Sequence, residues 1–391
     1  MNLARSRAPA GPRLLPPLGP VTVATLFHGL PGAPLAPSDP AAWRRELPVL
    51  IEEGLSGLAL GALDRSQATI EPALREQLTA VHRAEIAMSR VAQAWAPAAV
   101  FSLQTAGVEA VVVKGPAVAM FYPRPGLRPF EDVDVLVPRE RFRTAMDALA
   151  LDGYVRPVPP RTYFPLLCRE GVNMWRPDGA SIDLHHRVPP WAFTAPLTFD
   201  RIHRASVPLD LGRGVVQGAS TPHNLLIAAL QIIGYRAGSS SKLKAWRDVY
   251  ELACHCEPAD AAKEARGLEL GWFLALVLRQ MPPYARPTGL LEALGGVRTS
   301  RAQMARLRRL FPPAIGSRSY SVGRLSRLPP ANGLAYLAAK VFPSQEFLRN
   351  VYGSRWAYVR WWRSAHEHLM DSAGARPSGA QPGLRREDEH S

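Results

Sequence analysis

Two aspartates, Asp132 and Asp134, stand two residues apart in an apolar run at residues 132–137 that has the composition of a buried strand. Side chains alternate between the two faces of a strand, so both carboxylates are expected to point the same way. Burying aligned carboxylates without a partner carries a large desolvation cost. A divalent cation is their simplest partner, and such ions commonly serve phosphate chemistry. The pair therefore predicts a metal site that handles phosphate groups.

A third acid, Asp183, belongs to the same prediction. A turn signal at residues 177–180 joins two expected strands, the second of them at residues 181–187. Three carboxylates on adjacent strands predict a two-metal site for phosphoryl transfer, in which Asp183 completes one metal site and orients or deprotonates the attacking group. His185 shares the face of Asp183 and is a candidate for contact with the substrate, the alternative being a structural hydrogen bond.

A tight turn before the two aspartates is predicted to bind the phosphates. A β-branched run at residues 108–113 ends in Lys114 and Gly115, and Pro116 suits the first position of a following helix. The free N–H groups at the start of that helix would face the phosphates. Lys114 and Arg128 would neutralise the charge that develops on them. The alternatives are a solvated Lys114 and an Arg128 that only pins its own loop.

Several segments of this sequence together resemble a known family. They are Lys114–Gly115, the run RPFEDVDVLV at residues 128–137 and IDLH at residues 182–185, together with LKAWRDVYEL at 243–252 and FPSQEFLRNVY at 342–352. In combination they are similar to the uncharacterised bacterial nucleotidyltransferase-like proteins of the polymerase-beta-like superfamily.

That resemblance implies a Mg²⁺-dependent enzyme that transfers NMP from an NTP to a hydroxyl, phosphate or amine acceptor and releases pyrophosphate. Two ions are expected, with Mn²⁺ as a possible substitute, and their ligands would be Asp132, Asp134 and Asp183. The residues expected to bind the nucleotide are Lys114, Gly115, Arg128 and His185. The acceptor is left open among small molecules, peptides and RNA.

The order of helical and strand patterns predicts an α+β fold with a small mixed-sheet nucleotidyltransferase core at residues 107–218. Helical regions are expected on both sides of this core, at residues 21–106 and 219–366. Disordered tails are expected at residues 1–20 and 367–391, where polar residues and proline accumulate.

The first helical region carries clear helix signals but none for chemistry. Asp39 and Pro40 mark a helix start, and a long Ala-rich helix is expected at residues 67–105. This region is therefore interpreted as a platform. In the second region, a helix at residues 243–256 carries Asp248, for which contact with nucleotide or acceptor is a weaker hypothesis than packing.

The chain of 391 residues carries 47 Lys and Arg against 33 Asp and Glu, a formal charge of +14. Such an excess favours anionic partners, although the Arg-rich usage is also typical of a GC-rich genome. The basic and aromatic residues at 298–363 are candidates for contact with an anionic partner, the alternative being helix packing with a solvated basic face. No run approaches the length of a transmembrane span, so a cytoplasmic location is expected.

Two other functions remain open. An Asp-x-Asp glycosyltransferase would hold a sugar nucleotide through a divalent ion, but it leaves Asp183 unexplained and needs a Rossmann-like half that the pattern does not show. A catalytically degenerate protein that binds nucleotide or RNA is the other. Pro116 keeps that hypothesis open, because the superfamily usually has Ser there and a hydroxyl and an N–H are lost.

Overall fold

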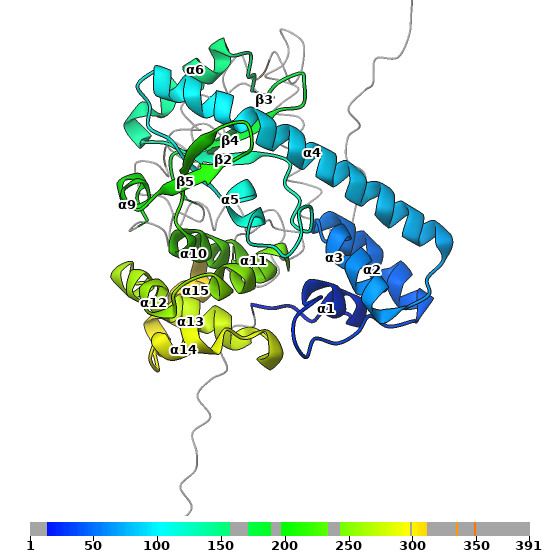
Figure 1. Cartoon of the computed structure of the whole chain (residues 1–391). Coiled ribbons are helices and arrows are strands. Elements are labelled where there is room, and N and C mark those ends of the chain that lie inside the picture. The colour runs from blue at the N-terminus through cyan, green and yellow to red at the C-terminus, as the bar shows by residue number, and fades with distance from the viewer. Residues whose placement is uncertain are drawn as a thin grey trace, which may run out of the picture.

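The fold is α+β, as the sequence predicts, with one mixed sheet packed between helices (Figure 1). The computed structural model describes residues 14–156, 171–188, 197–233, 243–297 and 299–310, together with Leu334 and Leu348. Most of the basic, aromatic stretch at 298–363, the family-like run at 342–352 and the tail at 367–391 lie outside these residues.

The sheet has six strands in the order β3-β4-β2-β1-β6-β5. The strands are β1 Val111–Val113, β2 Val133–Leu136, β3 Gly171–Trp175, β4 Ser181–His185, β5 Val207–Asp210 and β6 Val215–Gly218. β2 runs parallel to β4 and antiparallel to β1, whereas β1 runs parallel to β6. The register sets Asp134 directly beside Asp183. Asp132, expected within the strand, lies immediately before β2.

One face of the sheet is covered by α4 (Pro72–Thr105) and α6 (Phe142–Leu151). Val133 and Val135 of β2, with Ile182 and Leu184 of β4, are buried in the hydrophobic core on this side. Because neighbouring side chains on a strand point to opposite faces, Asp134, Asp183 and His185 lie on the other face. That face is turned toward the C-terminal helices.

The N-terminal helices are α1 (Pro20–Leu26), α2 (Pro40–Glu52) and α3 (Ser56–Ser66), followed by α4. The predicted cap is confirmed, since the Asp39 carboxylate accepts the N–H groups of Ala41 and Ala42. The helix predicted to begin at Gln67 begins at Pro72, and Gln67 itself has a left-handed backbone that ends α3. Ahead of α1, Leu14 and Leu15 pack against the helical core, although disorder was expected there.

The C-terminal helices follow β4, and all but the first of them also follow β5 and β6. They are α9 (Phe199–Arg204), α10 (Thr221–Ile232), α11 (Leu243–Cys254), α12 (Pro258–Gly267), α13 (Gly271–Gln280), α14 (Thr288–Ala293) and α15 (Arg301–Leu310), and two short 3₁₀ turns occur at Arg139–Arg141 and Pro283–Ala285. The two helical regions are not independent, because Phe27, Trp43, Trp246 and Phe273 belong to one hydrophobic core. Helices from both ends of the chain therefore form a single body beneath the sheet (Figure 1).

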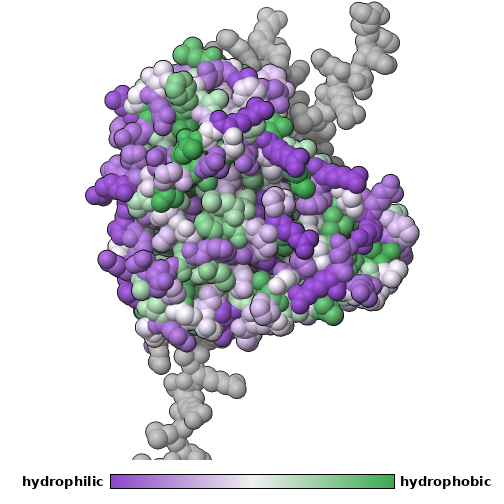
Figure 2. All heavy atoms as spheres, viewed as in Figure 1, coloured by the Kyte–Doolittle hydropathy of each residue, from purple (hydrophilic) through white to green (hydrophobic). Residues whose placement is uncertain are grey.

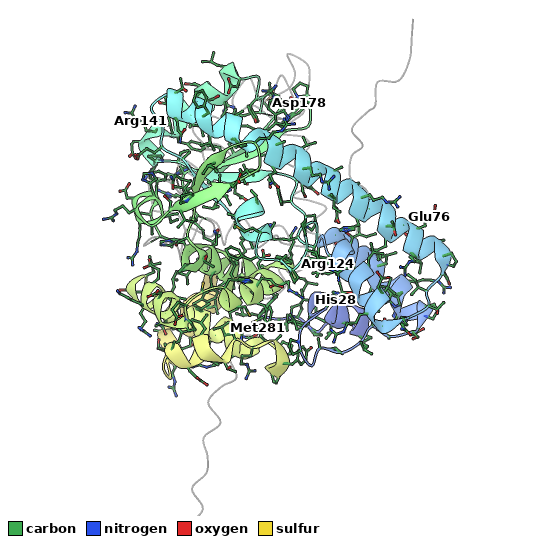
Figure 3. The ribbon with its side chains drawn as sticks, viewed as in Figure 1. His28, Glu76, Arg124, Arg141, Asp178 and Met281 are labelled. Atoms are coloured by element: carbon green, nitrogen blue, oxygen red, sulfur yellow. The ribbon has the colours of Figure 1, made fainter. Side chains whose placement is uncertain are left out.

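The loop before β2 lies against this body. Arg124 of the loop stands beside the N-terminal helices, close to His28, whereas Glu76 marks the far tip of α4 (Figure 3). Hydrophilic residues cover most of the face seen in Figure 2, with apolar residues in small patches among them. Among the described helices, none combines the length and apolar character needed to cross a membrane.

Candidate active site

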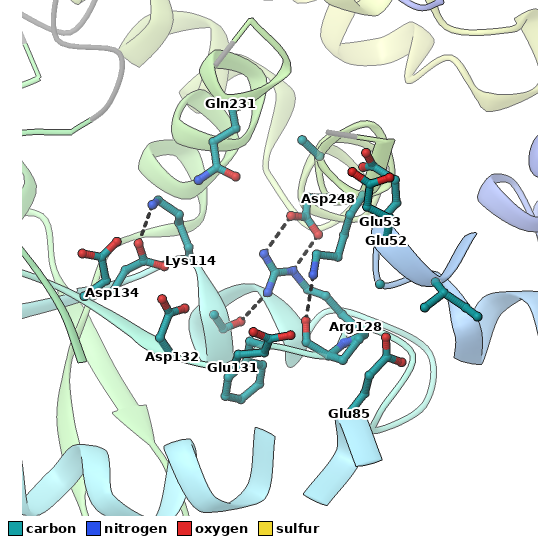
Figure 4. A pocket seen from close by; sticks show the side chains of 18 residues that line it. Glu52, Glu53, Glu85, Lys114, Arg128, Glu131, Asp132, Asp134, Gln231 and Asp248 are labelled. Carbon is teal, nitrogen blue, oxygen red and sulfur yellow. Dashed lines mark hydrogen bonds and ion pairs between the residues drawn. The ribbon is translucent and has the colours of Figure 1, made fainter. Parts of the chain in front are cut away.

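A pocket of about 510 Å³ lies between the sheet and the helical body (Figure 4). It is lined by four parts of the chain, namely the α2–α3 junction, one position of α4, the strand ends with the loop before β2, and helices α10 and α11. Its charged lining residues are Glu52, Glu53, Glu85, Lys114, Arg128, Glu131, Asp132, Asp134, Asp183, Lys244 and Asp248.

Two of the predicted acids, Asp134 and Asp183, meet His185 at one side of this pocket. The Nε2 atom of His185 lies 2.9 Å from Asp134 Oδ1 and 3.0 Å from Asp183 Oδ2. Burial alone would lower the pKa of His185, but the two carboxylates outweigh it and raise this pKa to about 9. Burial would raise the pKa of Asp183, but His185 holds it below its usual value.

Lys114 contacts the same carboxylate from the other side. Its Nζ atom lies 2.5 Å from Asp134 Oδ1. Although burial opposes the charged form, Asp134 raises the pKa of Lys114. In turn, Lys114 and His185 hold the pKa of Asp134 below its usual range against the effect of burial. Asp134 is therefore an ionised carboxylate with two positive groups on one oxygen atom.

Asp132 lines the same pocket beside this cluster. Its carboxylate is 3.4 Å from the side-chain amide of Asn173 on β3. Burial, followed by the neighbouring Asp134 and Asp183, raises the pKa of Asp132 to about 7. The described residues whose ligand atoms converge within 4.8 Å are Asp134, Asp183 and His185. Asp132 lies outside that set, and its role as a metal ligand stays a prediction.

The turn between β1 and α5 (Gly115–Ala119) has the backbone that the sequence suggests. Gly115 has φ +37°, and a Cβ atom there would lie 3.4 Å from the carbonyl oxygen of Asp132. The preceding Lys114 has φ +52°, which is unusual for a residue with a side chain. The N–H of Lys114 donates to the side chain of Asn224 on α10. The helix α5 has five residues, in agreement with the short helix expected after Gly115.

Arg128 lines the pocket, but its guanidinium is engaged by the protein. The Nε and NH2 groups donate to the two oxygens of Asp248, at 2.7 and 2.8 Å. The NH1 group donates to the carbonyl of Gly115 at 3.1 Å. Both Arg128 and Asp248 are buried. These contacts pin the loop, which was the alternative considered for Arg128, and its contact with nucleotide stays a prediction.

The opposite wall of the pocket comes from residues that the sequence did not single out. The amine of Lys244 on α11 donates to the carbonyl of Pro129, and burial lowers the pKa of Lys244. Glu53 accepts the backbone N–H of Leu243 at the start of α11, and Ser56 donates to Glu85. The N-terminal region, interpreted as a platform, therefore forms part of the pocket wall. The run LKAWRDVYEL was a signal for Lys244, whereas no local pattern indicated Glu53 or Glu85.

A comparison with protein families places this geometry in context. The family described as "Uncharacterised nucleotidyltransferase" matches residues 39–281, which is more than half of the chain. The chain belongs to this nucleotidyltransferase family. The matched span begins at the Asp39 cap and ends at Met281, directly after α13, so it contains every residue that lines the pocket. The predicted family, enzyme class and fold class are thereby confirmed.

Two further comparisons add little to this result. No curated protein matches the chain. A solved structure, that of an antigenic nucleotidyltransferase-like protein from Paracoccidioides brasiliensis, is 15% identical, with a TM-score of 0.36, and the match covers 53% of this chain and 92% of that one. A likeness at that level does not bear on the arrangement of the site.

Proposed function

We propose that this nucleotidyltransferase transfers NMP from an NTP to an acceptor with the help of divalent cations held by Asp134 and Asp183. The single observation that carries the proposal is the parallel register of β2 and β4. It sets the two aspartates side by side on the face that lines the pocket, with Lys114 against them. Family membership favours an NTP over a sugar nucleotide as the donor.

The donor atoms present here fit a divalent cation. Asp134 and Asp183 offer carboxylate oxygens, which suit Mg²⁺ and Mn²⁺. His185 would add an imidazole nitrogen, which suits transition ions, if the arriving ion displaces the proton that its Nε2 shares with the two carboxylates. When bound, such an ion would neutralise phosphate charge and lower the pKa of a coordinated hydroxyl group. Asp132 is proposed as a further ligand, because it lies beside two carboxylates and would be stabilised in its ionised form by a cation.

The protein groups around the aspartates have separate proposed tasks. The Lys114 ammonium lies where it would pair with phosphate oxygens of the donor, and it needs no large movement to exchange Asp134 for them. The side chain of Asp183 is 29% exposed, against 11% for Asp134, and it is the carboxylate proposed to orient the acceptor. Gly115 supplies the positive φ of +37° that the turn requires, and its backbone is proposed to face the phosphates. The acceptor would be a small molecule, a peptide or RNA.

The proposal is tested by titration calorimetry with MnCl₂ alone and with each of the four NTPs in the presence of Mg²⁺. We expect Asp134→Asn and Asp183→Asn to abolish Mn²⁺ binding, and with it the Mg²⁺-dependent binding of NTP. The matched control is Asp178→Asn in the turn between β3 and β4, which pairs with Arg176 away from the pocket. Affinities that stay at the wild-type level in both site variants would overturn the proposal.

A further inference from the structure

The turn at Lys114 and Gly115 adopts a backbone that needs outside support. Lys114 is one of three residues other than glycine with positive φ in the described part of the chain, and its ψ of −142° puts it outside the small left-handed helical region. Residues in such sparsely populated regions persist where their surroundings hold them, and they gather at functional sites. The contacts that hold this turn are therefore of interest.

Helix α10 provides the first set of contacts that support the turn. The side-chain oxygen of Asn224 accepts the N–H of Lys114 at 3.0 Å, and the side-chain amide of Asn224 donates to the carbonyl of Ala219 at 2.8 Å. Asn224 is buried, so both of its polar ends are committed to backbone groups rather than to water. This arrangement fixes the orientation of the peptide that precedes the Lys114 side chain.

The second set of contacts comes from α11 and acts, through Arg128, on the peptide that joins Gly115 to Pro116. Asp248 binds Arg128 through both carboxylate oxygens, and Arg128 in turn donates to the carbonyl of Gly115. The hydroxyl of Tyr122 donates to Asp248 at 2.7 Å and completes the buried group. The guanidinium of Arg128 pairs with a charge and also fixes the position of the Gly115 carbonyl. It does so because the planar group binds the carboxylate and the carbonyl in one geometry.

Neither Asn224 nor Asp248 contacts the carboxylates that would bind metal. The polar groups of Asn224 contact Lys114 and Ala219, and those of Asp248 contact Arg128 and Tyr122. Asn224 lies 110 positions after Lys114 in the chain, and Asp248 lies 120 positions after Arg128. The C-terminal helices thus act on the side of the site where the phosphates of the donor would lie, and leave the metal ligands to the sheet.

We propose that Asn224 and Asp248 are positioning residues, which hold the Lys114–Gly115 turn in the conformation that receives the phosphates of the donor nucleotide. This inference rests on the proposed function. Its consequence is a division of labour between two properties that can be measured separately. Loss of the contacts made by Asn224 or by Asp248 weakens the binding of NTP, whereas the affinity of the aspartates for a cation is retained.

The test compares two buried ion pairs on the same helix. Asp248→Asn weakens the ion pair of Asp248 with Arg128. Glu251→Gln weakens the equally buried ion pair of Glu251 with Arg247, one turn further along α11. The Arg247 guanidinium of the second pair also donates to the carbonyls of Leu26 and His28 and lies over the rings of Tyr122 and Tyr250 at 5.8 and 5.7 Å. Neither Glu251 nor Arg247 contacts the backbone of Lys114 or Gly115 among the interactions described for them. A general effect of disrupting α11 would therefore appear in both variants.

We expect Asp248→Asn to weaken the calorimetric binding of Mg-ATP by about tenfold to a hundredfold, the usual effect of losing a partner that orients binding groups. Its affinity for Mn²⁺ alone should stay within about twofold of wild type, as should both affinities of Glu251→Gln. Thermal melts of both variants establish that they are folded. Arg128→Lys gives the same measurement with Asp248 intact, since a lysine retains the charge but cannot make all three contacts. Asn224→Ala is expected to show the same split.

The outcomes separate this inference from the proposed function. If wild-type protein binds no NTP, or if Asp134→Asn does not affect that binding, the proposed function fails. If wild type binds Mg-ATP through the aspartates but Asp248→Asn and Arg128→Lys bind it equally well, the inference alone is overturned. Equal losses in Asp248→Asn and Glu251→Gln, or a parallel loss of Mn²⁺ affinity, would also overturn it, because either would show a structural role.

Discussion

The change Lys114→Met is expected to shift two affinities in opposite directions. The Lys114 ammonium contacts Asp134 Oδ1 at 2.5 Å, and Asp134 is also one of the three residues whose ligand atoms converge. We expect the proposed ion to share that oxygen. A divalent ion binds carboxylate oxygen at about 2.2 Å, so the ammonium and a bound ion would lie no more than roughly 5 Å apart. The lysine is therefore expected to compete with the proposed cation, in addition to its proposed role as a partner for phosphate.

The repulsion can be sized from that distance. A single and a double positive charge about 5 Å apart repel each other by roughly 7 kcal/mol at an effective dielectric constant of about 20. Only a part of this repulsion opposes metal binding, because the long side chain of Lys114 can rotate away from the ion. If about 1.4 kcal/mol of this repulsion remains when the ion is bound, the affinity for the cation is already tenfold lower than without the lysine. Lys114→Met is thus expected to bind Mn²⁺ at least about tenfold more tightly than wild type.

The affinity of the variant for NTP is expected to fall, because Lys114→Met removes the ammonium group proposed to pair with phosphate. Calorimetric titration with MnCl₂ and with Mg-ATP measures both effects on one preparation. Lys244→Met serves as the control, since its amine binds the carbonyl of Pro129 and no carboxylate, and its Mn²⁺ affinity should stay within about twofold of wild type. An unchanged or weakened Mn²⁺ affinity in Lys114→Met would refute this account of the site.

Two further changes probe how α4 holds the loop before β2. Ser89→Ala is expected to cost about 1–3 kcal/mol of unfolding free energy in urea denaturation, because the buried N–H of Phe130 loses the hydroxyl that accepts it at 2.8 Å. A loss below about 0.5 kcal/mol would contradict this reasoning. Gly126→Ala is expected to destabilise more than Gly107→Ala. Both glycines have positive φ, but only at Gly126 would a Cβ atom come within 2.9 Å of Ile86. Equal losses in thermal melts would show that backbone strain alone matters.

The part of the site that rests on local pattern could be predicted from the sequence. A period of two in the apolar residues around Asp134 and Asp183 indicates which face each carboxylate occupies, and this property needs no knowledge of distant contacts. The parallel pairing of β2 with β4 then brings the two aspartates together. The turn at Gly115 follows from the close approach to the backbone of Asp132. Strand ends were less accurate, since Asp132 lies just outside β2.

The remaining walls of the pocket depend on contacts that no local pattern encodes. Arg128 finds its partner 120 residues later in Asp248, and a sequence motif around Arg128 does not specify that choice. Helix α3 went unpredicted because Gly57 and Gly61 lower its helix propensity. Both glycines make room for histidine rings, since a Cβ atom at Gly57 would lie 2.5 Å from the ring of His82 and one at Gly61 would lie 2.6 Å from the ring of His28. Tertiary packing overrides the local preference here.

The bond between Glu53 and the backbone of Leu243 joins residues 190 positions apart and closes the pocket wall across most of the folded chain. Contacts of such long range form late, because the intervening loop must be closed before they contribute. During synthesis at about 5–20 residues per second, α11 follows the aspartates of β2 by roughly ten seconds. A nascent chain thus displays its acidic cluster before the helices that enclose it exist. A fragment that stops after β6 would retain the aspartates of the sheet but would lack α10 and α11, which line the pocket.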